Sequence, residues 1–356
     1  MQRSSNSWQG IIREFRELLP DVQDESIVTL NEGNTPLIES SHIVSMLPGG
    51  LSLFFKFEGL NPTCSFKDRG MTLAVSKAKE AGSKAVICAS TGNTSASAAA
   101  YAAQGGLSAC VIVPKGKVAL GKLSQAMMHG AKVIEIEGNF DEALSMVREI
   151  SAKYPITMVN SLNPYRIEGQ KTGAYEVCNA LGQAPTYHFI PVGNAGNITA
   201  YWRGYGEFNN SGRISNLPKM MGFQAAGAAP IVKGHPIDDP QTIATAIRIG
   251  NPASWKGAEA ARDESGGVIK AVTDEEILEA YTLLAGKEGV FCEPASAASL
   301  AGVFKMAKRG IFSNGDVIVC TLTGHGLKDP DCAIKNSEKP VTIKPSVEEV
   351  VEILGL

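Results

Sequence analysis

The sequence predicts an α/β fold made of two doubly wound, open-sheet domains. Short apolar runs alternate along the chain with segments of helix length, which is the pattern of right-handed βαβ units in a parallel sheet. The composition agrees, because 44% hydrophobic residues, 37 glycines and 6% aromatic residues are typical of a soluble α/β enzyme. With 356 residues, the chain can bury one large core or two modest ones.

Six apolar runs are expected to form buried strands, and they divide into two groups. The runs are residues 84–89, 108–113, 132–136, 156–159, 187–192 and 316–322. The first four follow one another closely, so we expect them to form a sheet of their own. The larger domain would then comprise residues 1–60 and 161–356, and residues 61–160 would form a smaller, mobile domain. The polar residues 209–219 are expected to form a surface loop.

The ends and the charge of the chain bear on its location. Residues 1–25 have the apolar spacing of an amphipathic helix and lack the apolar centre of a signal peptide. The seven cysteines include no Cys-x-x-Cys pair, as expected for reduced thiols in the cytoplasm. A net charge of -3 gives no strong field that would attract nucleic acid or a membrane surface, and no apolar run approaches the roughly 18 residues of a membrane span. We therefore expect a cytoplasmic protein without nucleic-acid or membrane partners.

The first segment that contains a candidate reactive residue runs from Asn61 to Gly70. It contains Lys67 in what should be the first turn of a helix. A lysine at a helix N-terminus opposes the helix dipole, which lowers its pKa and favours the neutral amine that a Schiff base requires. An ordinary solvated lysine in a loop is the alternative, and this segment alone leaves both open.

Three further segments follow predicted strands, where ligands bind in open parallel sheets. Residues 90–94 offer hydroxyls, an amide and free N–H groups for a carboxylate or phosphate, although an ordinary N-cap has the same composition. Residues 191–197 contain two glycines that allow the main chain to approach a phosphate, or they form a simple Gly/Asn turn. Residues 321–330 offer a hydroxyl for a ring nitrogen and glycines that leave room for a flat ligand, a weak signal by itself.

Together with Asn31 to Leu37, these four segments resemble the fold-type II pyridoxal 5′-phosphate enzymes. Residues 65–70, 193–197 and 322–330 resemble the threonine synthases in particular. The resemblance extends from about residue 31 to residue 330, with the motifs in the same order. It implies the tryptophan synthase β-like form of the two-domain α/β fold.

The resemblance also implies roles for individual residues. Lys67 would carry pyridoxal 5′-phosphate as a Schiff base, Asn93 would meet the ring hydroxyl, and Thr323 would place a hydroxyl against the pyridine nitrogen. The loop around the cofactor phosphate would consist of Gly193, Asn194, Ala195, Gly196 and Asn197. The candidates for binding the carboxylate and phosphate of the substrate are Ser90, Thr91, Thr94, Asn160, Ser161, Arg166 and Asn194.

The reaction that the resemblance implies is the conversion of O-phospho-L-homoserine and water to L-threonine and phosphate, by γ-elimination and β-addition of water. We also expect a homodimer. A threonine or serine dehydratase of the same fold is the main alternative, although that group usually has a glycine-only phosphate loop where this chain has Asn194 and Asn197. A cofactor-binding protein without turnover is less consistent with an intact Lys67.

Other classes of protein and site are disfavoured. A nicotinamide-dependent oxidoreductase would share the alternating βα pattern, but no Gly-x-Gly-x-x-Gly follows the first strand. The histidines His42, His129, His188 and His235 lack metal-ligand spacing, so we expect no metal site. Glu293 could face the cofactor or lie at the start of a helix, and the sequence leaves both open.

Overall fold

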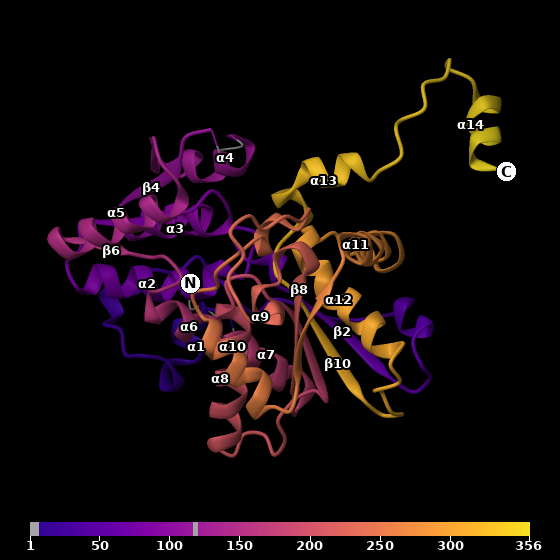
Figure 1. Ribbon diagram of the computed structural model, residues 1–356, viewed down its shortest axis with the longest axis horizontal. Helices are drawn as coiled ribbons and strands as arrows, with labels where there is room; N and C mark the ends of the chain where they lie inside the picture. The colour runs from indigo at the N-terminus through magenta and orange to yellow at the C-terminus, as the bar shows by residue number, and fades with distance from the viewer. Residues whose placement is uncertain (1–6, 117–119) are drawn as a thin grey trace.

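The computed structural model describes residues 7–116 and 120–356, and the strands of this part form two separate sheets (Figure 1). The larger sheet has six strands in the order β1-β2-β10-β7-β8-β9. Strand β1 is antiparallel to β2, and all other neighbours are parallel. In the order of the sheet the strands are β1 (Leu37–Glu39), β2 (Ser52–Phe57), β10 (Val317–Leu322), β7 (Tyr187–Pro191), β8 (Lys219–Ala225) and β9 (Val268–Val272).

The smaller sheet contains the four closely spaced strands that the sequence predicts. Its order is β5-β4-β3-β6 and all its pairs are parallel. The strands are β5 (Lys132–Ile136), β4 (Ser108–Pro114), β3 (Ala85–Ala89) and β6 (Ile156–Met158). The α/β class and the grouping of strands into two sheets are therefore confirmed.

Helices cover both faces of the smaller sheet. Helices α2, α3 and α4 share a hydrophobic cluster with β3 and β4, whereas α5 packs against the same strands in a second cluster. The alanine-rich sequence of α3 buries Ala98, Ala99 and Ala102, whose small side chains let neighbouring backbone pack closely. These helices are α2 (Lys67–Glu80), α3 (Asn93–Gly105), α4 (Leu120–Met128) and α5 (Phe140–Lys153).

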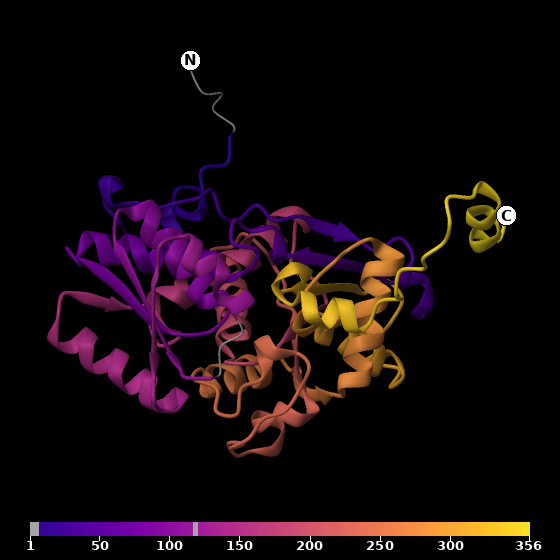
Figure 2. The same cartoon turned by 90° about the horizontal axis from the view of Figure 1, so that it is seen from above.

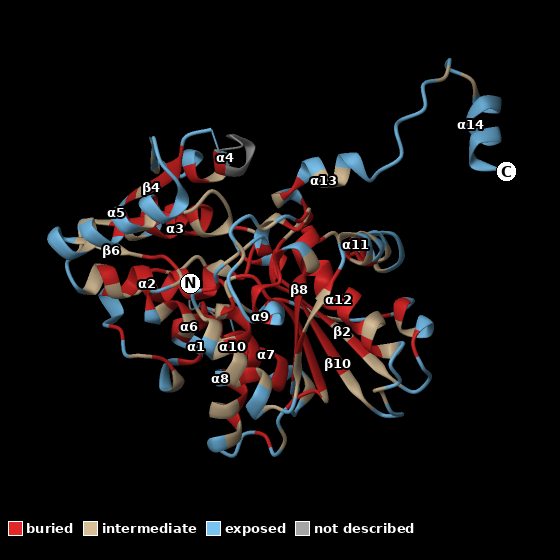
Figure 3. Cartoon of the chain, in the orientation of Figure 1, coloured by how far each residue is buried: buried red, intermediate tan, exposed pale blue. Residues whose placement is uncertain are grey.

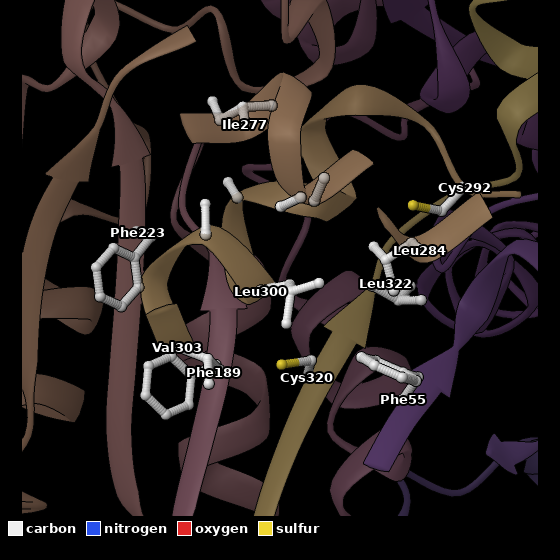
Figure 4. Packing of buried hydrophobic residues seen from close by; sticks show 14 of the residues in the cluster. Phe55, Phe189, Phe223, Ile277, Leu284, Cys292, Leu300, Val303, Cys320 and Leu322 are labelled. Carbon is white, nitrogen blue, oxygen red and sulfur yellow. The ribbon is translucent and has the colours of Figure 1, made fainter. Parts of the chain in front are cut away.

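The larger sheet is also buried on both faces, as its apolar strands require. Figure 4 shows one face, where Phe189 and Phe223 of the sheet pack with Leu300 of α12. The next residue of β7, Ile190, points to the other face and packs in the cluster that contains α7, α8 and α10. The helices around this sheet are α7 (Thr172–Leu181), α8 (Gly196–Asn210), α10 (Trp255–Glu264), α11 (Asp274–Glu288) and α12 (Pro294–Ala307).

The remaining helices are short, and one expectation about them is wrong. Instead of a continuous amphipathic helix, the described part of the first 25 residues contains only α1 and short 3-10 turns, while residues 1–6 lie outside the described part. Ile11, Ile12 and Phe15 are nevertheless buried, so tertiary packing and not helix formation explains the apolar spacing. The short helices are α1 (Ile11–Glu14), α6 (Pro164–Gln170), α9 (Pro230–Lys233), α13 (Pro330–Lys335) and α14 (Val347–Leu354).

The loops and the C-terminal segment complete the chain. Helix α8 ends at Asn210 and β8 begins at Lys219, so the expected surface loop is confirmed between them. Figures 1 and 2 show the segment with α14 extending away from both sheets, and Figure 3 shows it exposed, in agreement with its lack of buried residues. Within residues 7–116 and 120–356, no helix is both long and apolar enough to cross a membrane.

Candidate active site

A cavity of about 1400 Å³ lies where the carboxyl ends of several strands meet the starts of helices. The loops after β3, β6, β7 and β10 contribute to its wall, in agreement with the rule for ligand sites in open α/β sheets. All of the site residues predicted from the sequence line this one cavity, namely Lys67, Ser90, Thr91, Asn93, Thr94, Asn160, Ser161, Arg166, Gly193, Asn194, Ala195, Gly196, Asn197 and Thr323.

Lys67 is the first residue of α2, as the sequence predicts. Burial lowers the pKa of its amine to about 7, and the nearby positive charge of Arg166 acts in the same direction, while Glu293 opposes them. A substantial fraction of the amine is therefore neutral near pH 7, the form that reacts with an aldehyde. The start of the helix is held by Asp68, whose carboxylate accepts hydrogen bonds from Thr63 and Ser97.

Arg69, the third residue of α2, is buried and belongs to an ion-pair network outside the cavity lining. Its guanidinium donates hydrogen bonds to the carboxylates of Glu58 and Glu176 at 2.6 to 2.8 Å. Lys56 of β2 donates to Glu176 at 2.7 Å. The network joins β2, α2 and α7, so it fixes the helix that carries Lys67 on the larger sheet.

Arg166 lies in α6, which begins at Pro164 after an Asn163 cap. Helices α2 and α6 touch closely, because a Cβ atom on Gly169 would lie 1.9 Å from the carbonyl oxygen of Arg69. This approach places Arg166 beside the start of α2. Only 2% of Arg166 is exposed, so it is a buried residue and not a surface residue at the start of a helix.

Among the described residues, no carboxylate pairs with the guanidinium of Arg166, in contrast to Arg69. Its Nη1 donates to the carbonyl oxygen of Val159 at 3.0 Å, and its Nε has no hydrogen-bond partner in the described part of the chain. Burial lowers its pKa to about 10, so the group stays charged at neutral pH. A buried cation of this kind on a cavity wall favours an anionic ligand.

The loop before α8 has the features of an anion site. Ala195 has a φ of 64°, and a Cβ atom on Gly193 would lie 2.9 Å from the Cα atom of Ile247. The side-chain amide of Asn197 is buried, yet neither of its polar atoms has a partner among the described residues. Because the loop ends at the N-terminus of a 15-residue helix, its free N–H groups favour a phosphate.

Asn194 and Asn160 serve partly to position these loops. Asn194 donates to the hydroxyl of Ser161 at 2.7 Å and accepts from the main-chain N–H of Ala253. Asn160 accepts from the N–H of Ala89 and donates to its carbonyl oxygen, so the Asn160 side chain continues the ladder of β3. The Asn160 amide thereby supports the segment that starts at Ser90.

Glu293 was left open by the sequence, and it faces the cavity. It occupies the N-cap position of α12 without making a side-chain cap hydrogen bond. Its carboxylate accepts from the amide of Asn93 at 2.9 Å and from the hydroxyl of Thr323 at 2.8 Å. The signal in the sequence was weak, because Glu-Pro at a helix start is also an ordinary pattern.

Two further residues line the cavity although the sequence analysis assigned them no role. Gln170 is buried on the cavity wall, and its side-chain oxygen has no partner within the described ranges. Lys328 follows β10 of the larger sheet and donates to the side chain of Gln125 in α4. Because α4 packs on the smaller sheet, this hydrogen bond links the two parts of the molecule. Burial lowers the pKa of Lys328. Gln170 lies in none of the segments singled out in the sequence, whereas Lys328 lies in residues 321–330 but had no role assigned to it.

The residues of the cavity fit pyridoxal 5′-phosphate. A lysine with a lowered pKa can bind its aldehyde carbon, and the loop with the unpartnered Asn197 can receive its phosphate. The donors Asn93 and Thr323 lie on the wall where a flat ring would need polar contacts. Seven free cysteines also match the expectation of reduced thiols.

Comparison with known proteins agrees with this fit. The family model described as "Pyridoxal-phosphate dependent enzyme" matches residues 28–324. A threonine synthase of Synechocystis sp. is 58% identical over 99% of this chain and 93% of the relative. The chain belongs to the threonine synthase group of the pyridoxal-phosphate dependent enzymes.

More distant comparisons extend the same result. The threonine synthase of Mycobacterium leprae is 56% identical over 98% of this chain and 97% of the relative. Among solved structures, maize serine racemase superposes with a TM-score of 0.76 at 20% identity, covering 92% of this chain and 96% of that one. This second likeness concerns the fold alone, and it confirms the expected fold-type II architecture.

Proposed function

We propose that this chain is a pyridoxal 5′-phosphate dependent lyase that converts O-phospho-L-homoserine and water to L-threonine and phosphate. The observation that carries the proposal is that Lys67 and Arg166 line one cavity. Lys67 has a lowered pKa, and Arg166 is a buried cation with no carboxylate partner in the described part of the chain. The first group suits attachment of the cofactor and proton transfer. The second suits a phosphate that leaves during the reaction.

The cofactor would be held by residues from both sides of the cavity. Lys67 would bind it covalently, residues 193–197 would receive its phosphate, and Asn93 and Thr323 would contact its ring. When bound, pyridoxal 5′-phosphate supplies an electron sink for the carbanion that forms on the substrate. The protein supplies orientation, charge and the movement of protons.

Lys67 is placed to move those protons. As a neutral amine it would remove the proton from Cα of the substrate and then one from Cβ, before phosphate leaves from Cγ. Lys67 would later return one of these protons at Cγ. Water would then add its hydroxyl at Cβ and give its proton to the phosphate, and Lys67 would return the second proton at Cα. Its lowered pKa, about 7, lets the same amine accept and return protons near neutral pH.

Arg166, on the wall of the same cavity, would bind the phosphate of the substrate. A guanidinium donates paired hydrogen bonds to phosphate oxygens, and burial strengthens this attraction by excluding water. The hydroxyls of Ser90, Thr94 and Ser161 line the same cavity and would bind the remaining oxygens of the substrate. The N-terminus of α3 beside Ser90 and Thr94 suits the substrate carboxylate.

A substrate panel tests this function against the dehydratase alternative. The purified holoenzyme is assayed for phosphate and threonine from O-phosphohomoserine, and for 2-oxobutanoate from threonine. The proposal predicts phosphate and threonine in equal amounts and much slower formation of 2-oxobutanoate. Rapid 2-oxobutanoate formation without phosphate release would favour the dehydratase.

We also propose that residues 61–160 form the smaller, mobile domain and that the protein acts as a cytoplasmic homodimer. All strands of the smaller sheet fall within residues 61–160, which supports the domain boundaries. The exposed apolar side chains of Val347, Val350 and Leu354 on α14 support an association that would cover them. Sedimentation of the purified protein tests the dimer directly.

A further inference from the structure

We propose that the carboxylate of Glu293 stands in for the cofactor ring in the cofactor-free protein and must release Thr323 when the ring binds. The proposal rests on the proposed function only in that Asn93 and Thr323 are taken as the ring contacts. It makes Glu293 a positioning residue that controls how fast the cofactor loads.

The geometry of Glu293 is that of a bridge between two donors. One carboxylate oxygen, Oε2, accepts from the amide of Asn93 at 2.9 Å, and the other, Oε1, accepts from the hydroxyl of Thr323 at 2.8 Å. Glu293 is 4% exposed and Thr323 is 5% exposed. The two donors that would receive the ring are therefore already engaged by one buried carboxylate.

The surrounding backbone is shaped for this carboxylate. A Cβ atom on Gly324 would lie 2.6 Å from the carboxyl carbon of Glu293, so only glycine at this position leaves room for it. The main-chain N–H of Glu293 donates to the carbonyl oxygen of Gly324 at 2.9 Å. Because Glu293 does not cap its own helix, the contacts of its carboxylate are those inside the cavity.

The hydroxyl of Thr323 cannot donate to Glu293 and to the ring nitrogen at the same time. The hydroxyl of Thr323 lies 2.8 Å from the carboxylate of Glu293 and 2.9 Å from the hydroxyl of Ser296. A threonine hydroxyl has one proton and a carboxylate can only accept, so Thr323 donates to Glu293 and accepts from Ser296. If Thr323 donates to the ring nitrogen instead, its hydrogen bond with Glu293 must break. Asn93 has two N–H donors and can keep one on Glu293 while the other meets the ring hydroxyl.

The bridge also joins the two sheets. Asn93 begins α3, which packs on the smaller sheet, whereas Thr323 follows β10 of the larger sheet. Glu293 gives the donors on these two elements one charged acceptor, and a buried hydrogen bond to a charged group is stronger than a neutral one. Glu293 therefore holds the start of α3 and the end of β10 in position in the cofactor-free protein.

The test is the kinetics of cofactor binding to the cofactor-free protein, followed by protein fluorescence after mixing with pyridoxal 5′-phosphate. Glu293→Gln keeps the size of the side chain and removes its charge, so it holds Thr323 less strongly. We expect association about 10-fold faster than in the wild type, since a hydrogen bond to a charged group is exchanged for a weaker neutral one. We also expect a lower Tm for the cofactor-free form and little change in the Tm of the loaded form.

Two controls separate this role from simple structural support. Glu32→Gln alters another buried carboxylate, which accepts from Tyr101 outside the cavity, and it should lower both Tm values equally without changing the association rate. In a Thr323→Val background, Glu293→Gln should no longer accelerate association. Unchanged or slower association in Glu293→Gln, or an equal loss of Tm in both forms, would overturn the proposal. Failure of the substrate panel would leave these binding measurements unaffected.

Discussion

Two buried arginines on adjoining helices have opposite surroundings, and the difference separates the scaffold from the site. Arg69 on α2 donates to two carboxylates, and Lys56 completes the network. Arg166 on α6 donates to one carbonyl oxygen and has an unpartnered Nε in the described part of the chain. A buried charge that the protein itself neutralises holds the fold together, whereas one left without a counter-charge is available to a ligand.

The pKa values follow the same division. The carboxylates around Arg69 raise the pKa of its guanidinium, so Arg69 stays charged throughout the physiological range. Burial lowers the pKa of Arg166 to about 10 and that of Lys67 to about 7, and at Lys67 the nearby carboxylate of Glu293 offsets only part of this effect. The protein thus tolerates an electrostatic cost where its chemistry is proposed to occur.

The largest expected effect comes from removing Lys67. Lys67→Ala should lower kcat by about 10³-fold or more, because covalent attachment of the cofactor and proton transfer are both lost. The purified variant should lack the yellow colour that survives dialysis in the wild type. Lys79→Ala, on the same helix, is the matched control and should retain both properties. Borohydride reduction and peptide mapping that place the label on another lysine would refute the assignment of Lys67.

The next effect is a loss of stability when a substitution breaks the Arg69 network. Arg69→Met leaves Glu58 and Glu176 with Lys56 as their remaining cation, so an uncompensated charge stays buried. The free energy of unfolding should fall by about 3–5 kcal/mol. Urea unfolding followed by circular dichroism measures it, and a loss below about 1 kcal/mol would show that the network is not part of the scaffold.

The smallest effect is a shift in a pH profile. The neutral form of Lys67 increases as pH rises through about 7, so the rate of covalent cofactor attachment should rise over the same interval and then level off. The charge of Arg166 is one cause of the lowered pKa, so Arg166→Met should move this rise to higher pH. Borohydride trapping at timed intervals across pH 5–9, the range around pKa values near 7, follows the attachment rate. A profile that does not move would contradict the electrostatic coupling.

Much of the smaller sheet could be predicted from the sequence, because its strands are short apolar runs with clear ends. Strands β3 and β5 and the start of α2 agree with the structure to within one residue. Strand β2 was missed, since its Ser-Leu-Phe-Phe-Lys-Phe sequence contains Lys56. That lysine is buried only because Glu176, 120 positions away in the chain, neutralises it. Strands β1, β8 and β9 were missed as well.

The residues that line the site could be predicted from the sequence, but their burial and their charged partners could not. The resemblance to the fold-type II enzymes implied that Lys67, Asn93 and Thr323 contact the cofactor, and all three line the cavity. Whether Arg166 was a surface residue or a buried cation depended on the contact between α2 and α6, which no local pattern encodes. The carboxylate of Glu293 likewise became significant only when its two donors were placed around it.

The most direct test compares the two arginines under identical conditions. Arg69→Met and Arg166→Met remove the same charge from neighbouring buried sites, and each is measured for its free energy of unfolding and for kcat/KM with O-phosphohomoserine. The account predicts that Arg166→Met keeps the cofactor and most of its stability while kcat/KM falls about 30- to 1000-fold, the cost of one charge-assisted contact to phosphate. Arg69→Met should show the reverse pattern, with its main loss in stability. An Arg166→Met variant with near wild-type kcat/KM, or one destabilised as strongly as Arg69→Met, would contradict the assignment of Arg166 to the substrate phosphate.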